Sequence, residues 1–357
     1  MPLDRLTLTN FRTYQDQQFE LDPAITLVVG PNASGKTNLL ESIYVLASTK
    51  SFRAKDRELI HHGADHYRIV AAAGHEQYAL AYQFQDGHQT KKASHNDVKR
   101  PLSKHVGQIQ AVLFEPGDLA MVSGPPEGRR RYLDYILCQT DAEYLTALNQ
   151  YRRALKQRNS LLSNFDTARI KDEIFAWDVK LTEFASTIYS KRQQLVAYLN
   201  QRINGIYASI AGGMVEFELN YLPSVKGQNY SDSFLSALAT NLTHDLAAGF
   251  TTIGPHREDF DISFRGNDIT AVASRGEVRT VVLALKLAEL EYSEEQSGRR
   301  PLLLLDDVFS ELDHQRRRDL LLRLTEHQVV ITTTEADAIV PDIGSKYRLI
   351  ETEAISA

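Results

Sequence analysis

The sequence predicts an α/β fold that is built from both ends of the chain and interrupted by an inserted helical arm. Three observations predict it: a glycine-rich loop between a buried strand and a helix, a long helical middle without proline, and apolar strands alternating with helices near the end. At roughly 100–200 residues per domain, 357 residues suggest two compact units, or one domain with a large insertion. The hydrophobic fraction of 43% and the charged fraction of 24% indicate a globular chain with a core.

The first hundred residues predict strands and one helix. Apolar residues nearly alternate with polar ones over residues 6–11, as expected for a half-buried strand. Residues 25–29 are almost wholly apolar, which is typical of a strand buried on both faces. Helical spacing follows over residues 39–46. Alternation over residues 67–84, with a polar turn at Asp86-Gly87, predicts antiparallel strands.

The middle of the chain is helical in pattern. Residues 129–211 contain no proline and one glycine, and their apolar residues recur at three- and four-residue steps. This spacing is typical of packed antiparallel helices, although the helices of an ordinary core share it. The combined length favours a projecting arm. We therefore expect an α/β head formed by residues 1–117 and 213–357, with the arm at 118–212 between them.

Strands and helices alternate after the arm. Strands are expected near residues 215–219, 260–264, 302–305 and 329–331, and helices near 234–246, 278–292 and 316–324. Such alternation predicts a unit with a parallel sheet.

The sharpest local signal is Gly30-Pro31-Asn32-Ala33-Ser34-Gly35-Lys36-Thr37, which fits the pattern G-x-x-x-x-G-K-[ST]. A loop that wraps a phosphate with backbone N–H groups needs glycine where a side chain would clash or φ is positive. The helix that follows directs its positive end at the same phosphates. Lys36 supplies a charge for the β and γ phosphates, and the Thr37 hydroxyl can bind Mg²⁺. Because a strand precedes and a helix follows, we expect these residues and Asn38 to bind a nucleoside triphosphate, in preference to forming an ordinary glycine-rich turn.

A pair of carboxylates supplies the second half of such a site. Asp306 and Asp307 directly follow four leucines, and an unpaired buried charge is costly, so a strand end that merely reaches solvent is the weaker interpretation. Asp306 is expected to hold Mg²⁺, and Asp307 to orient or deprotonate the attacking water. About 270 residues separate Lys36 from this pair, which indicates a large insertion.

Composition excludes several classes of protein. No apolar run approaches the ~20 residues of a membrane span, and the first residues lack the apolar core of an export signal, so a cytoplasmic location is expected. The single cysteine, Cys138, cannot form an internal disulfide or a cysteine metal cluster. His61, His62 and His66 have no neighbouring carboxylate or cysteine set, so we expect solvent-exposed residues and no metal site.

Charge is unevenly distributed along the chain. Residues 129–202 hold 13 basic and 8 acidic residues, a net of +5, which leaves −11 for the rest of a chain whose total is −6. The basic residues singled out are Arg129, Arg130, Arg131, Arg152, Arg153, Lys156, Arg158, Lys191 and Arg192. A solvated helical face is the usual explanation, and a contact with DNA phosphates is the alternative. The aromatic residues are too scattered to predict stacking on single strands.

The chain resembles the RecF family of recombination mediators, in the SMC-like branch of the ABC ATPases, over essentially its whole length. The segments that carry the resemblance are Leu8–Tyr14, Ser51–Arg53, Glu58–Ile60, the P-loop, Pro116–Asp118, Gly124–Asp134, Gly254–Asp259 and Leu305–Asp313. The resemblance implies that Ser274 and Gly276 occupy the signature motif, whose serine and glycine contact the γ-phosphate held by a second subunit. Taken alone, such a segment is more often a simple helix N-cap. The family usually has glutamine where Arg275 and Glu277 stand.

The same resemblance places Asp313 in the D-loop, near the dimer seam. Thr332-Thr333-Thr334 occupies the place where many ABC ATPases carry a switch histidine. A hydroxyl of one of these threonines is then expected to sense the γ-phosphate, which is consistent with slow hydrolysis.

Family resemblance further implies ATP and Mg²⁺ as cofactors, an ATP-dependent homodimer, and binding to single- and double-stranded DNA at gaps. The implied partners are RecR and, indirectly, RecO and RecA. Two other hypotheses are a small-molecule P-loop kinase, in which Asp307 activates an acceptor hydroxyl, and a passive DNA-binding scaffold with a vestigial nucleotide site. Intact Lys36, Thr37, Asp306 and Asp307 argue against the scaffold.

Overall fold

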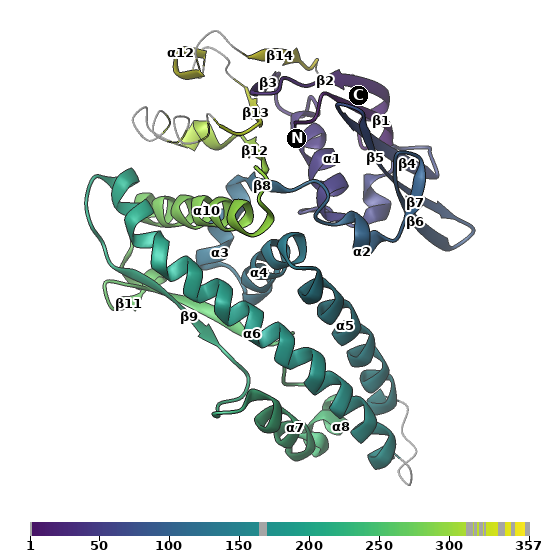
Figure 1. Ribbon diagram of the computed structural model, residues 1–357, viewed down its shortest axis with the longest axis vertical. Coiled ribbons are helices and arrows are strands. Elements are labelled where there is room, and N and C mark those ends of the chain that lie inside the picture. The colour runs from purple at the N-terminus through teal and green to yellow at the C-terminus, as the bar shows by residue number, and fades with distance from the viewer. Residues whose placement is uncertain are drawn as a thin grey trace. The chain divides into compact units, whose positions relative to one another are not determined.

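The computed structural model describes residues 2–163, 170–311, 317, 320, 324, 326–334, 340–343 and 347–353. The chain forms two compact units (Figure 1): residues 1–118, 210–212 and 289–357 make the first, and residues 119–209 and 213–288 make the second. Residues 213–288, which the sequence analysis assigned to the head, thus pack with the second unit. The functional division into a head of 1–117 and 213–357 and an arm of 118–212 stays a prediction.

An antiparallel sheet of six strands forms one part of the first unit, in the order β2-β1-β4-β5-β6-β7. Its strands are β1 (Arg5–Phe11), β2 (Tyr14–Glu20), β4 (His66–Ala73), β5 (Glu76–Gln85), β6 (His88–His95) and β7 (Val98–Arg100). The turn predicted at Asp86-Gly87 connects β5 to β6, and both residues have positive φ there. The expected antiparallel strands are confirmed.

A parallel sheet of five strands forms the other part of this unit, in the order β14-β3-β13-β12-β8. Its strands are β3 (Ile25–Val29), β8 (Ala111–Phe114), β12 (Leu302–Asp306), β13 (Val329–Thr333) and β14 (Arg348–Glu351). Val29 pairs with Thr333, and Asp306 pairs with Thr332, so β3, β12 and β13 end at the same edge of the sheet. Strands from both ends of the chain therefore bring their carboxyl ends together at one edge of the parallel sheet.

Helix α1 (Lys36–Ser48) packs on both sheets. Leu39, Leu40 and Ile43 are fully buried in a core that also takes side chains from β1, β4, β5 and β12. The short elements of this unit are η1 (Asp56–Leu59), α2 (Leu102–His105), η2 (Pro116–Leu119), η3 (Val308–Glu311) and α12 (Val340–Ile343). Burial of α1 between two sheets fixes the loop at its N-terminus.

The second unit is mainly helical. Its helices are α3 (Ala120–Ser123), α4 (Pro126–Thr140), α5 (Ala142–Ser163), α6 (Ile170–Ala211), α7 (Tyr230–Thr240), α8 (Leu242–Ala248), α9 (Ile269–Val272) and α10 (Arg275–Ser297), the last of which continues into the first unit. Helices α5 and α6 lie side by side (Figure 1), joined by an ion pair from Arg158 to Asp178. The packed helices expected in the middle of the chain are confirmed.

One predicted helix is broken. The sequence pattern predicts a single helix over residues 234–246, but α7 ends at Thr240 and α8 begins at Leu242. Asn241 stands between them, and its backbone N–H and its side-chain amide both donate to the carbonyl of Ala237. This capping by a residue that competes for backbone hydrogen bonds ends the first helix.

Two strands predicted for the parallel sheet lie elsewhere. Strands β9 (Phe217–Leu222) and β10 (Asp259–Phe264) pair antiparallel with each other, and β11 (Asn267–Asp268) adds to β10. The burial of β10 alternates from residue to residue, which is typical of an antiparallel strand with one buried face. The prediction of a parallel arrangement was therefore wrong for these two strands.

The predicted helix at 316–324 lies largely outside the described residues; Arg317, Leu320 and Leu324 are helical. Within the described part of the chain, no helix combines the length and the apolar character that a bilayer span requires.

Candidate nucleotide-binding site

The P-loop connects β3 to α1, and two of its glycines are required by close contacts. A Cβ atom on Gly30 would lie 2.2 Å from Thr352 Oγ1 and 2.4 Å from the Thr352 carbonyl oxygen. Gly35 has a φ of +97°, and a Cβ there would lie 2.9 Å from the hydroxyls of both Thr13 and Tyr14. A side chain at either position would displace the loop, so the glycine spacing is a packing requirement as well as a conformational one.

The Lys36 ammonium lies inside the curve of the loop. Its Nζ donates to the carbonyl oxygens of Gly30, at 2.6 Å, and Pro31, at 2.7 Å. Burial lowers the pKa of Lys36, and the carboxylates of Asp307 and Asp306 oppose that shift. The cation therefore stands between the loop and the two carboxylates that the sequence analysis singled out.

Thr37 and Asp306, which are 269 positions apart, come into direct contact. Thr37 Oγ1 donates to Asp306 Oδ1 at 2.9 Å, and Thr332 Oγ1 donates to the same oxygen at 2.7 Å. Hydroxyl and carboxylate oxygens are the ligands that Mg²⁺ takes when it is held by few protein groups and by substrate phosphates. The donor set fits the ion that the sequence predicted at this position.

Asp307 adopts an unusual backbone conformation at the end of β12. Its φ of 50° lies in the left-handed region, which costs a non-glycine residue of order 1–3 kcal/mol. Its N–H donates to Thr332 Oγ1 at 3.1 Å and to the Thr332 carbonyl oxygen at 3.3 Å. Strained residues cluster at functional sites, and Asp307 directly follows Asp306, the residue expected to bind Mg²⁺.

Among the three successive threonines, Thr332 contacts both carboxylate residues. Thr333 contributes a carbonyl that accepts from the Gly30 N–H at 3.4 Å, and Thr334 is exposed. The D-loop candidate Asp313 lies outside the described residues.

Sequence analysis missed the contribution of Thr352. Its hydroxyl lies 2.6 Å from Ser34 Oγ, and its N–H donates to the Val29 carbonyl. Thr352 thus packs against the P-loop at Gly30 and Ser34. No local pattern marks it, because it follows the edge strand β14 more than 300 positions away.

A buried carboxylate beside the loop was also missed. Glu41, on α1, is fully buried and accepts hydrogen bonds from Arg12, Arg53 and Ser51. Burial alone would raise the pKa of Glu41, but these three donors outweigh it and lower the pKa. Arg53 also donates to Asn38 Oδ1 at 2.6 Å, which connects the cluster to the first turn of α1.

The second unit holds the remaining site candidates, Ser274 and Gly276. Ser274 precedes α10 and forms a capping box with Glu277: the Glu277 N–H donates to Ser274 Oγ at 3.3 Å, and the Ser274 N–H donates to Glu277 Oε2 at 2.8 Å. Open space surrounds the position of a Gly276 Cβ. Glu277 therefore has a structural role in starting the helix.

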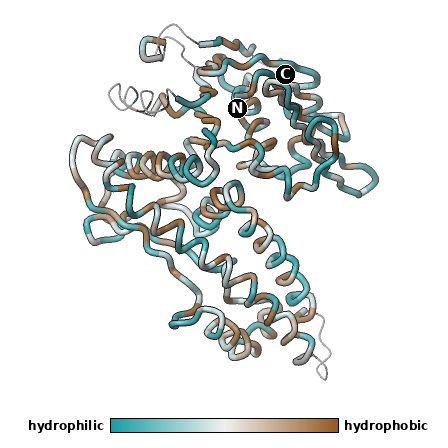
Figure 2. Tube along the Cα trace, in the orientation of Figure 1, coloured by the Kyte–Doolittle hydropathy of each residue, from teal (hydrophilic) through white to brown (hydrophobic). Residues whose placement is uncertain are grey.

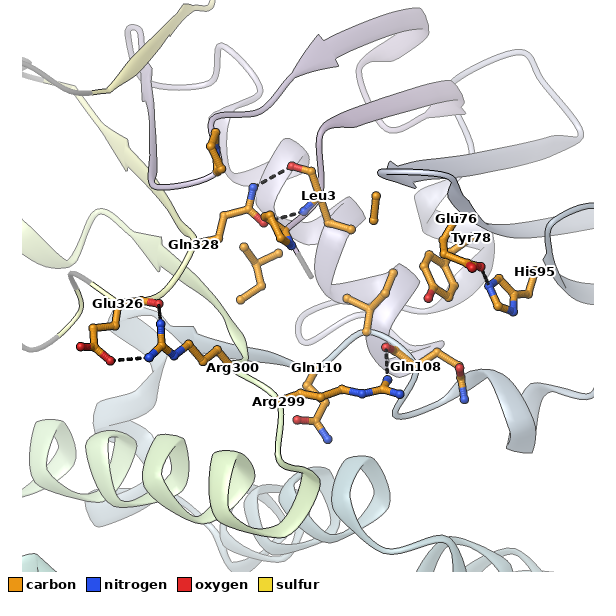
Figure 3. Close-up of a pocket in the computed structure, with 15 residues that line it drawn as sticks. Leu3, Glu76, Tyr78, His95, Gln108, Gln110, Arg299, Arg300, Glu326 and Gln328 are labelled. Atoms are coloured by element: carbon orange, nitrogen blue, oxygen red, sulfur yellow. Dashed lines mark hydrogen bonds and ion pairs between the residues drawn. The ribbon is translucent and has the colours of Figure 1, made fainter.

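A cavity of about 600 Å³ in the first unit is separate from this site (Figure 3). It lies at the opposite edge of the parallel sheet, where Leu302 and Gln328 mark the starts of β12 and β13. Gln328 bonds both backbone groups of Leu3 there, and Arg300 pairs with Glu326. No P-loop residue lines it, so this cavity is not the nucleotide site.

A sequence profile described as the RecF/RecN/SMC N terminal domain matches residues 2–351. The chain belongs to this family. It is 36% identical to a DNA replication and repair protein RecF of Staphylococcus aureus (strain JH9) over 362 residues, which cover 98% of this chain and 97% of that one.

Solved structures agree with this membership. The fold is similar to that of a recombination mediator protein RecF with ATP in the RecFOR pathway, with a TM-score of 0.86 and 32% identity over 94% of this chain and 92% of that one. The corresponding RecF-ATPrS structure gives a TM-score of 0.87 and 31% identity, over 98% and 97%. An Smc head domain from Pyrococcus furiosus shares the fold at 15% identity, with a TM-score of 0.52 over 96% of this chain and 91% of that one.

The RecF-family relationship confirms the fold class expected from the sequence, an ATPase head of the ABC/SMC type with an inserted helical part. It does not support the small-molecule kinase alternative.

Proposed function

We propose that this chain is an ATP-dependent clamp in recombinational DNA repair and replication. Two copies close on DNA when ATP binds and open again after hydrolysis. The observation that carries the proposal is the hydrogen bond from Thr37 Oγ1 to Asp306 Oδ1, because it unites the P-loop with the carboxylate that follows β12. The relatives support the same reading, since they are RecF proteins and two of them are described with ATP or ATPrS in the RecFOR pathway.

Each site residue has a role in this proposal. The backbone of Gly30–Thr37 and the side chain of Asn38 surround the phosphates, and Lys36 places its charge at the β and γ groups. Thr37 and Asp306 would hold Mg²⁺, which neutralises phosphate charge when bound. Asp307 orients or deprotonates the attacking water from its strained position after β12. Ser274 and Gly276 contact the γ-phosphate bound by a second copy.

ATP in this proposal controls timing, and turnover is slow. Thr332 takes the place of a switch histidine, and its hydroxyl bonds the Asp306 carboxylate and accepts from the Asp307 backbone N–H. The clamp recognises single-strand/double-strand junctions at gaps, acts with RecR and, indirectly, with RecO, and helps to load RecA in the cytoplasm. The family relationship supports this choice of partners.

Sedimentation with ATP·Mg²⁺, with ADP and without nucleotide tests the clamp. A dimer that forms only with ATP is expected, whereas a chain that binds ATP and stays monomeric contradicts the proposal. Asp307→Asn should bind ATP, slow turnover and prolong the dimer, and Lys36→Arg should weaken hydrolysis more than binding. Asp86→Asn, the same chemical change in an exposed turn, is the matched control and should behave as the unaltered chain.

A further inference from the structure

The six-stranded sheet of the first unit has one buried face and one open face. Leu8, Ile69 and Leu80 are fully buried and are neighbours in the strand register, so their face packs on the core. Successive residues of a strand point to opposite faces. The residues between them therefore form an outer face, which antiparallel sheets commonly expose to water.

Three basic residues share this outer face. Arg68 on β4 pairs in register with Ala81 on β5, which pairs with Lys92 on β6. Lys99 on β7 pairs with Ser94, two positions from Lys92. Because neighbouring strands lie ~4.8 Å apart, Arg68 and Lys92 are about 10 Å apart at their backbones, and Lys92 and Lys99 are diagonal neighbours at roughly 7–8 Å.

Within the described part of the chain, no ion pair neutralises the charges of this trio. Arg68, Lys92 and Lys99 are exposed, and no carboxylate among the described residues pairs with any of them. Of the carboxylates near this face, Asp16 and Glu20 lie on β2 at the opposite edge of the sheet, and Asp65, just before β4, is bonded to His66 and Gln83. Exposed Arg100 and Lys104 follow Lys99 at the basic edge, and Asp97 stands in the turn before it. Figure 2 shows long hydrophilic stretches along β6 and β7.

Lys91 shows what a paired lysine looks like on the same strand. It points to the inner face, is bonded to Asp56 and to the Thr49 carbonyl, and is mostly buried. Its neighbour Lys92 points outward and has no such partner among the described residues. The alternation of β6 thus separates a structural lysine from one available to a ligand.

The side chains between the basic residues indicate the kind of ligand. On β4–β7 the outer face has small residues beside the charges, such as Ala79, Ala81 and Ser94, and no Phe, Tyr or Trp. Protein interfaces depend on aromatic and other apolar anchors, and single-stranded DNA is held by stacking on aromatic rings. A positively charged surface of small side chains that has no aromatic anchors fits the regularly spaced phosphates of a duplex.

We propose that the outer face of strands β4–β7 binds the phosphate backbone of duplex DNA through Arg68, Lys92 and Lys99. This inference rests on the proposed function, since it assigns a contact surface for the duplex side of a gap. It is distinct from the arm helices and from the P-loop, because the three side chains point away from the core on which α1 packs.

The test compares the full-length chain with the triple variant R68Q/K92Q/K99Q in ATP·Mg²⁺, by fluorescence anisotropy of a labelled 30-base-pair duplex between 50 and 200 mM salt. Each phosphate contact contributes about 0.9 to the slope of log K against log salt. Loss of three contacts should lower the slope by about 2.7, so the affinity ratio between the two salt concentrations should shrink about 40-fold.

A matched control removes three exposed charges that lie outside this face and outside residues 129–202, in K226Q/R257Q/R300Q. The control should keep most of the wild-type slope. Equal slopes for the triple variant and the wild type overturn this inference and leave the clamp intact. A wild-type chain that binds no duplex overturns both this inference and the proposed DNA clamp. ATP-dependent sedimentation then shows separately whether the dimer forms. The triple variant should dimerise with ATP as the wild type does.

Discussion

The helices α4–α6 carry more basic residues than the outer face of the sheet, yet most of those singled out in the helices are paired within the fold. Arg158 is fully buried between Asp178 and Asp245, and Arg192 is buried with Asp134. On the sheet, by contrast, the outward cations have no carboxylate partner among the described residues. The number of basic residues in a segment therefore does not measure the charge that it offers to DNA.

Most of the basic residues singled out in the helical segment have a partner within the second unit. Those with a partner are Arg129 (Asp259), Arg130 (the Glu258 carbonyl), Arg152 (Asp134), Arg158, Lys191 (Asp141 and Glu143) and Arg192. Exposed Arg131, Arg153 and Lys156 have none among the described residues. Any DNA contact on the arm is therefore expected at these three residues.

The largest effect should come from breaking the buried arm cluster. Arg158→Met leaves Asp178 and Asp245 as uncompensated buried charges, which costs about 3–5 kcal/mol of unfolding free energy. Urea unfolding can be followed by the fluorescence of Trp177, the single tryptophan of the chain. Trp177 lies next to Asp178 on α6 and so reports on the unfolding of that helix. The control is Arg153→Met on the exposed face of α5, which should change the unfolding free energy by less than about 0.5 kcal/mol. Similar losses for both variants would mean that the cluster does not hold the unit together.

The second-largest effect is expected from breaking the ion cluster around buried Glu41 in the first unit. Glu41→Gln removes the charge that binds Arg12 and Arg53 and should cost about 2 kcal/mol at pH 7. The pKa of Glu41 is lowered in the folded chain, so its stabilisation is present above the ordinary value of 4.5 and is lost as the pH falls through the folded pKa. Amide hydrogen exchange of α1 should therefore differ most between wild type and variant near pH 7 and least under acid conditions. A difference that grows on acidification would contradict the assignment.

Local patterns predicted the parts of the site that a continuous segment encodes. The P-loop, the strand before it and the carboxylates after four leucines were all recognisable, because each is a short run with its own physical signature. Thr352 could not be predicted, since its contact with Ser34 depends on the pairing of β14 with β3. Strand β8 was missed because four buried residues are too few to show a period.

The carboxylates that pair with the basic residues of the arm could not be predicted either, because they lie far away in the sequence. Asp245, which binds Arg158, lies 87 positions away in α8, and only the folded chain brings the two together. A helix cap, by comparison, is a local pattern, and the N-cap considered for the segment at Ser274 from the sequence is present as a capping box with Glu277.

A third, smaller effect concerns DNA binding by the arm. Neutralising Arg153 and Lys156 in R153Q/K156Q should lower the salt slope of duplex affinity by about 0.9 for each residue that contacts a phosphate. Arg152→Gln should lower it less, because Arg152 already pairs with Asp134 at 3.1 Å. Anisotropy titrations at several salt concentrations measure both. An unchanged slope for R153Q/K156Q would remove these residues from the contact surface and leave the sheet face as the stronger candidate.

The smallest effect should come from Glu277→Gln, where an exposed ion pair and a helix cap share one carboxylate. Glutamine retains the acceptor that the Ser274 N–H needs, so the capping box should persist and only the pair with Arg265 is lost. Because Arg265 is 55% exposed, that pair contributes at most about 1 kcal/mol. Glu277→Ala removes the cap as well and should cost about 0.5–1 kcal/mol more in urea unfolding. If the two variants lose the same stability, the ion pair and not the cap is what the glutamate supplies, and an exposed pair then stabilises this helix start more than its solvent screening predicts.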